Sequence, residues 1–331
     1  MSESLPIGIL IPTRNCLGLL RRQLASLQAV LGIAQEVVVV DGESSDGSLE
    51  FLRANLRHAS VRFESRPRGL YQGWNYGVSL LRSRYLHIAT AGDAITVEGL
   101  RHLYEVAEGF EADVVLSPPR FLREDGRVLP RKRWSLHELI EALRPDGPFL
   151  LGEGQVFITS VCHGMAGMMG SSASNLYRTA ALQERPFPTD FGHVGDTAWG
   201  LAAALALRFV VTPRACAEFV IHGGGEELSL TQAAEVEARL LVLAQATLSL
   251  AKSDGRLGDD AGSLERALDS YETRRRVLTE AMQEYDSLRA AKWLGKLHPA
   301  VWQARRRRAA ARQRLRDLWL ESLREFAPKT D

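Results

Sequence analysis

Residues 36–47 read EVVVVDGESSDG, and this stretch decides the fold class. Its four consecutive valines place apolar side chains on both faces, as in a central parallel strand that helices cover on both sides. Asp41 ends the apolar run, and the glycine- and serine-rich turn after it leads into a helical pattern over 48–56. A strand that ends in a polar turn and continues into a helix is the unit of a parallel α/β sheet.

The same unit recurs on both sides of this stretch. Short apolar runs predict strands over 7–11, 61–64 and 85–89, and apolar residues at helical spacing predict helices over 17–31 and 70–81. Strands that alternate with helices indicate right-handed crossovers and a mostly parallel central sheet. The carboxyl ends of such strands meet at one edge, which is where α/β folds bind ligands.

The pattern changes after about residue 113. A strand is expected over 113–117 and a helix over 197–207, whereas 152–174 is rich in Gly, Ser and Met, has no clear period, and is therefore predicted to be a loop. Beyond about residue 231 the chain reads as helices only. We therefore divide it into a first segment, 1–115, a second segment, 116–230, and a helical extension, 231–331.

The composition is that of an ordinary folded protein. The 331 residues are 45% hydrophobic and 24% charged, which excludes wholesale disorder. Because 41 basic residues face 40 acidic ones, the chain is not basic throughout, and no nucleic-acid partner is expected. The three cysteines form no CxxC pair, and there is neither a basic and apolar leader nor an apolar run of about 18 residues. These features predict a cytoplasmic protein.

Each of the first four predicted strands ends in a polar or glycine-rich loop. The loops read PTRN at 12–15, DGESSDG at 41–47, RPRG at 66–69 and TAGD at 90–93. Taken singly, Asp41 could be a turn former and Asp93 the N-cap of a helix over 96–107. Four such loops at one sheet edge favour a binding site.

The four motifs, in this order and spacing, resemble the nucleotide-sugar-binding half of the family-2 inverting glycosyltransferases, which have the GT-A fold. The runs that carry the resemblance are LPIGILIPTRN, EVVVVDGESSDGS, SRPRGLYQGWNYGV and RYLHIATAGDAIT. The resemblance covers about residues 1–115, weakens over 116–225 and does not reach 231–331. It implies a GT-A-type fold with a mostly parallel central sheet, followed by a C-terminal helical region.

The resemblance also implies a donor site and a metal site. A nucleoside diphosphate would be held at the strand ends by Pro12, Thr13, Asn15, Asp41, Arg68 and Gly92. Asp41 would accept a hydrogen bond from the base, and Arg68 would pair with phosphate or base. Asp93 corresponds to the metal-binding carboxylate, and Mg²⁺ or Mn²⁺ would be the cofactor. The family's preceding Asp is Gly92 here, so His222 is the candidate that completes the metal site.

The second segment is expected to carry the general base and the acceptor site. Asp196, at the start of the helix predicted over 197–207, resembles the family's general-base carboxylate, and helix capping would also favour its charged form. Asp190 and His193 are lesser candidates for the same role. His163 and Trp199 are the candidates for contact with the acceptor.

A basic, amphipathic helical pattern covers 302–326. Between residues 301 and 331 there are nine lysines and arginines against four acids. Apolar residues recur there at helical spacing, namely Leu315, Leu318, Trp319, Leu323 and Phe326. Such a helix packs on the catalytic domain or a second subunit, or it lies on the anionic inner face of a membrane. Both alternatives stay open at this stage.

The sequence thus predicts an inverting, hexosyltransferase-type enzyme of polysaccharide biosynthesis. It would move a sugar from a nucleoside-diphosphate sugar to a hydroxyl of a glycan or lipid-linked saccharide, with a metal at Asp93 and Asp196 as base. The alternative is a non-catalytic nucleotide-sugar-binding or assembly protein with a degenerate GT-A domain, because Gly92 departs from the family pattern. The absence of GxGxxG and GxxxxGK[ST] from the sequence disfavours a dinucleotide-binding dehydrogenase and a P-loop enzyme.

Overall fold

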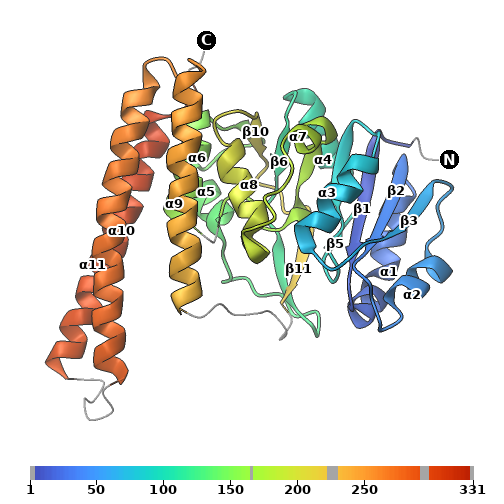
Figure 1. Ribbon diagram of the computed structural model, residues 1–331, viewed down its shortest axis with the longest axis horizontal. Helices are drawn as coiled ribbons and strands as arrows, with labels where there is room; N and C mark the ends of the chain where they lie inside the picture. The colour runs from blue at the N-terminus through green and yellow to red at the C-terminus, as the bar shows by residue number, and fades with distance from the viewer. Residues whose placement is uncertain (1–3, 165–166, 222–229, 291–297, 329–331) are drawn as a thin grey trace.

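The computed structural model describes residues 4–164, 167–221, 230–290 and 298–328 (Figure 1). Its centre is an eight-stranded sheet whose first four strands in space are parallel and pair in the order β3-β2-β1-β4. The sheet consists, in spatial order, of β3 (Val61–Ser65), β2 (Glu36–Asp41), β1 (Ile7–Thr13), β4 (Tyr85–Ile88), β9 (Leu176–Arg178), β6 (Val114–Leu116), β10 (Phe209–Val211) and β8 (Phe149–Leu150). The predicted mostly parallel central sheet is confirmed; β9 and β8 are its antiparallel members.

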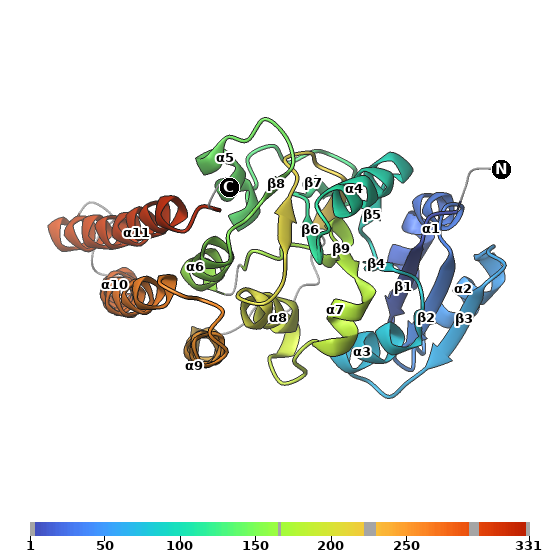
Figure 2. The same ribbon diagram turned by 90° about the horizontal axis from the view of Figure 1, so that it is seen from above.

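The valine run of β2 serves both faces of this sheet. Val38 and Val40 join a core that includes Trp74 of α3 (Leu70–Leu80), whereas Val37 and Val39 join the core on the opposite face. Adjacent residues of a strand point to opposite faces, so an uninterrupted apolar run is what a strand covered on both sides requires. Figure 2 shows α1 (Leu17–Leu31) and α4 (Val97–Gly109) on one side of the sheet and α3 and α7 (Thr179–Glu184) on the other.

Helices connect and cover the strands. They are α1 (Leu17–Leu31), α2 (Ser48–Asn55), α3 (Leu70–Leu80), α4 (Val97–Gly109), α5 (Ser135–Leu143), α6 (Glu153–His163), α7 (Thr179–Glu184) and α8 (Gly195–Ala203). A second, three-stranded sheet has the order β5 (Ala94–Ile95), β11 (Ala217–Ile221) and β7 (Arg120–Arg123). Strands β6, β8, β9 and β10 lie in the same large sheet as β1 to β4, so the first two expected segments share one sheet. The segment boundaries themselves stay predictions.

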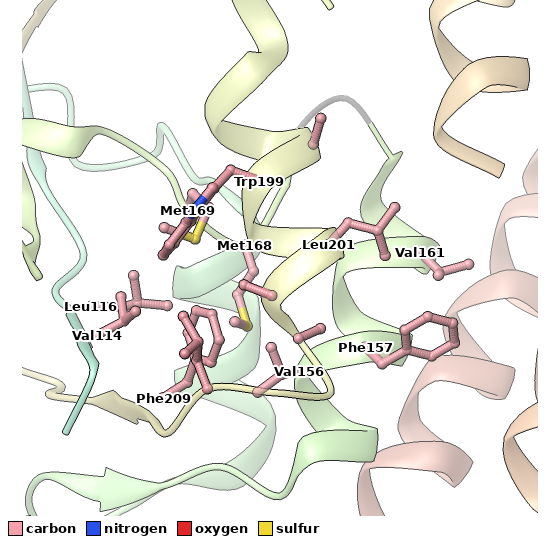
Figure 3. Packing of buried hydrophobic residues seen from close by; sticks show 14 of the residues in the cluster. Val114, Leu116, Val156, Phe157, Val161, Met168, Met169, Trp199, Leu201 and Phe209 are labelled. Carbon is pink, nitrogen blue, oxygen red and sulfur yellow. The ribbon is translucent and has the colours of Figure 1, made fainter. Parts of the chain in front are cut away.

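The loop predicted over 152–174 was wrong in its first half, because α6 spans Glu153–His163. Eight consecutive residues of this helix, 154–161, are buried. Figure 3 shows Val156, Phe157 and Val161 of α6 packed near Leu201 and Phe209. A helix that is buried on all sides has no polar face, so it lacks the amphipathic period on which the sequence reading relies.

Three long helices follow the sheet domain: α9 (Leu230–Ser253), α10 (Asp260–Ala290) and α11 (Pro299–Glu325). They lie at the end of the molecule opposite to β2 and β3 (Figures 1 and 2). The five apolar residues expected on one face of the last helix are all buried, namely Leu315, Leu318, Trp319, Leu323 and Phe326, and Trp319 is 2% exposed. The indole N–H of Trp319 donates to Thr159 Oγ1 of α6 at 3.0 Å. Packing on the sheet domain therefore accounts for the apolar face of α11.

The chain was also searched for membrane-spanning segments. Within the residues that the structure describes, no helix combines the length and the apolar composition that crossing a bilayer requires.

Candidate active site

A cavity of about 640 Å³ opens at the carboxyl ends of β1 to β4. It is lined by the loops that follow these strands, by the first turn of α3, and by Thr189, Gly192 and His193 from the segment before α8. The parallel strands bring these loops to one edge, as the sequence predicted for the four motifs. Pro12, Thr13 and Arg68 are the expected donor-site residues that line the cavity directly.

The cavity wall is strongly basic. Arg14, Arg66 and Arg68 contribute to it, and no described lining residue is an aspartate or glutamate. The Arg66 guanidinium lies 4.4 Å from the centroid of the Tyr76 ring, which holds it by a cation–π contact. Three guanidinium groups around one concave space favour a ligand that carries phosphate groups.

Asp41 lies at the end of β2, next to the lining residues Val40 and Gly42. Its side chain is 1% exposed, and Oδ2 accepts a hydrogen bond from the Ser44 amide at 2.8 Å. Its Oδ1 has no hydrogen-bond partner among the described residues. A buried carboxylate oxygen without a partner costs free energy, so an acceptor is available for an N–H of a bound ligand.

Two further expected donor-site residues act through the loops. Asn15 has a left-handed backbone with φ of 44°, and its Oδ1 accepts from the Ser45 amide at 2.8 Å, so it ties the β1 loop to the β2 loop. Gly92 has φ of +96°, a conformation in which an L-residue is strained. The buried side chain of Gln23 accepts from the Gly92 amide at 3.0 Å and donates to the carbonyls of Thr90 and Asp93. Gln23 thus holds the loop in which Gly92 replaces the first of the family's paired carboxylates.

Asp93 is buried, with 7% of its surface exposed, and is not among the residues that line the cavity. Its Oδ2 accepts from Thr90 Oγ1 at 2.7 Å and Ser171 Oγ at 3.2 Å, and its Oδ1 accepts from the Val220 amide at 3.3 Å. Both oxygens are therefore engaged by protein donors. In the described ranges, no group of three His, Cys, Asp or Glu side chains is arranged to hold a metal ion. His222, the second expected ligand, lies outside the described residues.

Asp196 sits in the first turn of α8 and is half-buried. Its Oδ1 accepts from the Thr197 amide at 2.7 Å. Burial raises the pKa of this carboxyl above its ordinary value, although the Thr197 amide and the Tyr71 hydroxyl counteract the effect. Tyr71 and His193 line the cavity, and the Tyr71 hydroxyl donates to the His193 carbonyl at 3.0 Å. The Asp196 carboxylate therefore lies beside the cavity, in contact with its wall.

The two expected acceptor residues lie elsewhere. Trp199 is 1% exposed, and its indole N–H donates to the Arg185 carbonyl. Figure 3 shows the ring next to Met169 inside the core, so its role is packing. His163 ends α6 and contacts the Trp319 ring with centroids 4.8 Å apart. It lines a different groove, which is described below. Asp190, a lesser candidate for the base, is exposed and ion-pairs with Arg239.

Sequence reasoning missed several residues of the site. Tyr71 and Trp74 of α3 stack edge to face at 5.2 Å between centroids and both line the cavity. The indole Nε1 of Trp74 is buried and has no partner within the described part of the chain. Their spacing in LYQGWNYG, directly after the RPRG turn, was an available signal. Gln23 gave none, because its contact with Gly92 joins positions 69 residues apart.

A family comparison matches the sheet-forming half of the chain. Residues 8–175, just over half of the chain, match the family described as glycosyl transferase family 2. This interval contains all four loop motifs of the cavity. A search of the curated proteins finds no match to the chain.

Solved structures of similar fold include those of a protein from S. aureus, TarS. The S. aureus TarS fragment 1–349 in complex with UDP-GlcNAc matches with a TM-score of 0.55 and 17% identity, over 98% of this chain and 93% of that one. The complex of the same fragment with UDP gives 0.52 and 18%, over 96% and 91%. At these identities the likeness concerns the fold alone. It extends over the C-terminal helices, because nearly all of the chain is covered.

Proposed function

The chain belongs to glycosyl transferase family 2, and from that membership and the cavity we propose that it moves a sugar from a nucleoside-diphosphate sugar to an acceptor hydroxyl with inversion at the anomeric carbon. The observation that carries this proposal is the buried, unpartnered Oδ1 of Asp41 beside a cavity with three arginines. A nucleoside diphosphate supplies both complements: an N–H on its base and two phosphates.

The nucleotide would bind with its base near Asp41. An N–H donor of the base satisfies Oδ1, while Oδ2 stays bound to the Ser44 amide. Trp74, which also lines the cavity, has an Nε1–H that could donate to a ligand oxygen. A hydrogen bond to a charged group contributes about 1.5–3 kcal/mol, so the contact with Asp41 would account for a measurable part of the affinity.

The diphosphate would face Arg14, Arg66 and Arg68. In a direct displacement the diphosphate leaves as the acceptor oxygen attacks the anomeric carbon from the opposite face. Negative charge then develops on the bridging oxygen of the leaving group. Guanidinium groups that are already in place stabilise this charge without further reorganisation. Arg68 is exposed and not committed to a carboxylate in the described ranges, so it is free to follow the phosphates.

Asp196 is proposed as the general base. The carboxylate would accept the proton of the acceptor hydroxyl as the new glycosidic bond forms. Burial raises the pKa of Asp196, and a base with a higher pKa accepts a proton more readily. Tyr71 links the two parts of the site, because it lines the cavity and reaches the Asp196 carboxylate.

A divalent cation remains a prediction. In the described ranges the surroundings of Asp93 do not fit a metal site, because Asp93 is buried away from the cavity lining and no group of three His, Cys, Asp or Glu side chains is arranged to hold an ion. No step above passes through a metal. Asp93→Asn and excess EDTA test the requirement directly: abolished turnover in both would support Mg²⁺ or Mn²⁺ at Asp93, and full turnover in EDTA would refute it.

A donor screen tests the proposed function. We expect one nucleoside-diphosphate sugar to raise the melting temperature and to be consumed when an acceptor is present. UDP-GlcNAc is the first donor to test, because the TarS fragment was solved with it. Inversion is read from the anomeric configuration of the product. Stabilisation without turnover for any acceptor would favour the non-catalytic alternative. Three further expectations remain predictions. They are a glycan or lipid-linked saccharide as the acceptor, a role in polysaccharide biosynthesis, and a cytoplasmic location that is possible at the inner face of a membrane.

A further inference from the structure

A second concave surface, which we call the basic groove, lies at the far end of the molecule from the donor cavity. It has a volume of about 580 Å³ between α5, α6, α10 and α11. Among the described residues that line it, five are arginines and one, Glu138, is a carboxylate. The arginines are Arg275 of α10 and Arg305, Arg308, Arg312 and Arg316 of α11.

The four arginines of α11 follow one another at intervals of three or four residues. This spacing places them on one face of the helix, with neighbouring Cβ atoms about 5–6 Å apart. Like charges at this spacing destabilise a helix unless something compensates them. Arg308 lies 4.1 Å from the centroid of the Tyr285 ring, which is a cation–π contact. Arg305, Arg312 and Arg316 form no ion pair with a carboxylate in the described ranges.

Arg275 differs from the other four because it ion-pairs with Glu237 of α9. When the paired Arg275 is set aside, four arginines remain against one described carboxylate, Glu138, so the groove keeps an excess of positive charge. Low-dielectric walls concentrate such a field, which raises the local concentration of anions.

The floor of the groove is partly apolar and carries one unsatisfied polar atom. His163 Nε2 is buried and has no hydrogen-bond partner among the described residues. Burial, assisted by the charge of Arg316, lowers the pKa of His163 to about 4. The imidazole is therefore neutral at physiological pH and adds no charge to the groove. The neutral ring has two tautomers, so Nε2 can either donate a hydrogen bond to a ligand at the floor of the groove or accept one from it.

We propose that the basic groove is a second anion-binding site, separate from the donor cavity, for a ligand that carries two or more phosphate groups. Guanidinium groups recognise phosphate oxygens with paired, charge-assisted hydrogen bonds. One phosphate can engage only neighbouring arginines, whereas Arg305 and Arg316 are 11 residues and about 16 Å apart along the helix. A ligand with several phosphates matches this length. The phosphates can come from a soluble polyphosphate or from the headgroups of anionic lipids.

Titration calorimetry with inorganic tripolyphosphate tests the site in the full chain. The variant R312Q/R316Q should weaken binding by at least about tenfold, because it removes two charge-assisted contacts. The matched control R306Q/R324Q removes the same charge from exposed positions of α11 outside the groove, and should change the affinity less than about twofold. Glutamine retains high helix propensity, so the helix should persist in both variants.

Two further variants make the test sharper. Glu138→Gln should strengthen binding severalfold, because it removes the only acid of the groove. Arg68→Gln removes one of the three arginines of the donor cavity, so binding that is weakened by R312Q/R316Q but not by Arg68→Gln belongs to the groove. Equal weakening by R312Q/R316Q and by the control pair would overturn the proposal, as would loss of all binding in Arg68→Gln.

Vesicles distinguish the two sources of phosphate. Co-sedimentation with vesicles of anionic phospholipid, compared with neutral phosphatidylcholine vesicles, should show the same order of variants if headgroups are the ligand. Binding of vesicles but not of tripolyphosphate would assign the site to a lipid surface. If neither probe binds, the proposal is wrong, and donor turnover in the same samples shows whether the proposed glycosyl transfer stands independently.

Discussion

The donor cavity and the basic groove are alike in size and sign of charge, but they are built from different parts of the fold. Volumes are about 640 Å³ and 580 Å³, with three arginines in the first and five in the second. The cavity is formed by loops at strand ends, and the buried Asp41 carboxylate lies next to its wall. The groove is formed by the sides of helices and has its one carboxylate, Glu138, at the start of α5.

The difference shows that positive charge attracts phosphate but does not by itself define a substrate. Loop backbones and a buried acceptor offer directional contacts, which discriminate one base or sugar from another. A row of arginines on a helix offers charge at a regular spacing and tolerates many phosphate ligands. The first surface therefore suits a specific donor, and the second suits a class of anions.

The largest expected effect concerns the floor of the groove. Trp319→Ala should lower the free energy of unfolding by about 3–5 kcal/mol, because it leaves a cavity and an unpaired Thr159 hydroxyl. Denaturant titration measures this, with Trp302→Ala as the control. Trp302 lies on the same helix but is 54% exposed, so its loss should cost within about 0.5 kcal/mol. If both surfaces are independent, donor affinity in the folded Trp319→Ala protein should stay unchanged.

The next effect concerns catalysis. Asp196→Asn should lower turnover by about 10²-fold or more while donor affinity stays nearly constant, because a general base acts in the transition state. Steady-state kinetics and calorimetry with the donor separate the two quantities. Asp190→Asn is the control and should be mild, since Asp190 is exposed and paired with Arg239. Greater sensitivity at Asp190 would transfer the role of base to that residue.

The same carboxyl predicts a pH dependence. Burial raises the folded-state pKa of Asp196 above the ordinary aspartate value of 3.8. Turnover should therefore fall as the pH drops through this raised pKa, because the protonated form cannot accept the hydroxyl proton. The contribution of Asp196 to the free energy of unfolding depends on pH in the opposite direction. It is fully present below the unfolded-state pKa and is lost as the pH rises through the folded-state pKa. Asp196→Asn should remove this contribution from the pH profile of unfolding.

A smaller effect is expected for the base contact. Asp41→Asn should weaken nucleotide binding by about tenfold, because the amide NH₂ would take the place of Oδ1 and oppose the N–H of the base. Calorimetry with the nucleoside diphosphate measures the change. Glu43→Gln removes a charge from the same turn at an exposed position and should leave the affinity within about twofold. Equal losses in both variants would mean that Asp41 acts only through net charge.

The smallest effect concerns the loop that departs from the family pattern. Gly92→Ala should destabilise the fold by about 1–2 kcal/mol, because an L-residue is strained at φ of +96°. Gly126→Ala is the control for this backbone cost, with φ of +80° and no atom within 4 Å of the added Cβ. The added Cβ at position 92 would lie 3.2 Å from a methyl carbon of Leu19. Any excess loss at Gly92 in thermal melts therefore reports that contact.

Most strands of the sheet, and the loops that follow them at the donor cavity, could be predicted from the sequence. β2 was predicted over 36–40 and is found over Glu36–Asp41, because a valine run bounded by a polar turn is a local signal. Pro12, Thr13 and Arg68 stand in loops that follow predicted strands, and the resemblance to the family implied that they bind the donor. Trp199 was misplaced, because an aromatic residue after a candidate base looks the same in sequence whether it faces a ligand or the core.

What the sequence by itself determined is the set of features encoded by neighbouring residues: strand and helix periods, turn chemistry and the four loops at the sheet edge. Only the tertiary structure decided which polar atoms are left without partners, as at Asp41, and which are engaged, as at Asp93. The tertiary structure also decided that α11 buries its apolar face on α6 and that four of its arginines line one groove. These outcomes depend on burial and on contacts between positions far apart in the chain, and no local pattern records such contacts.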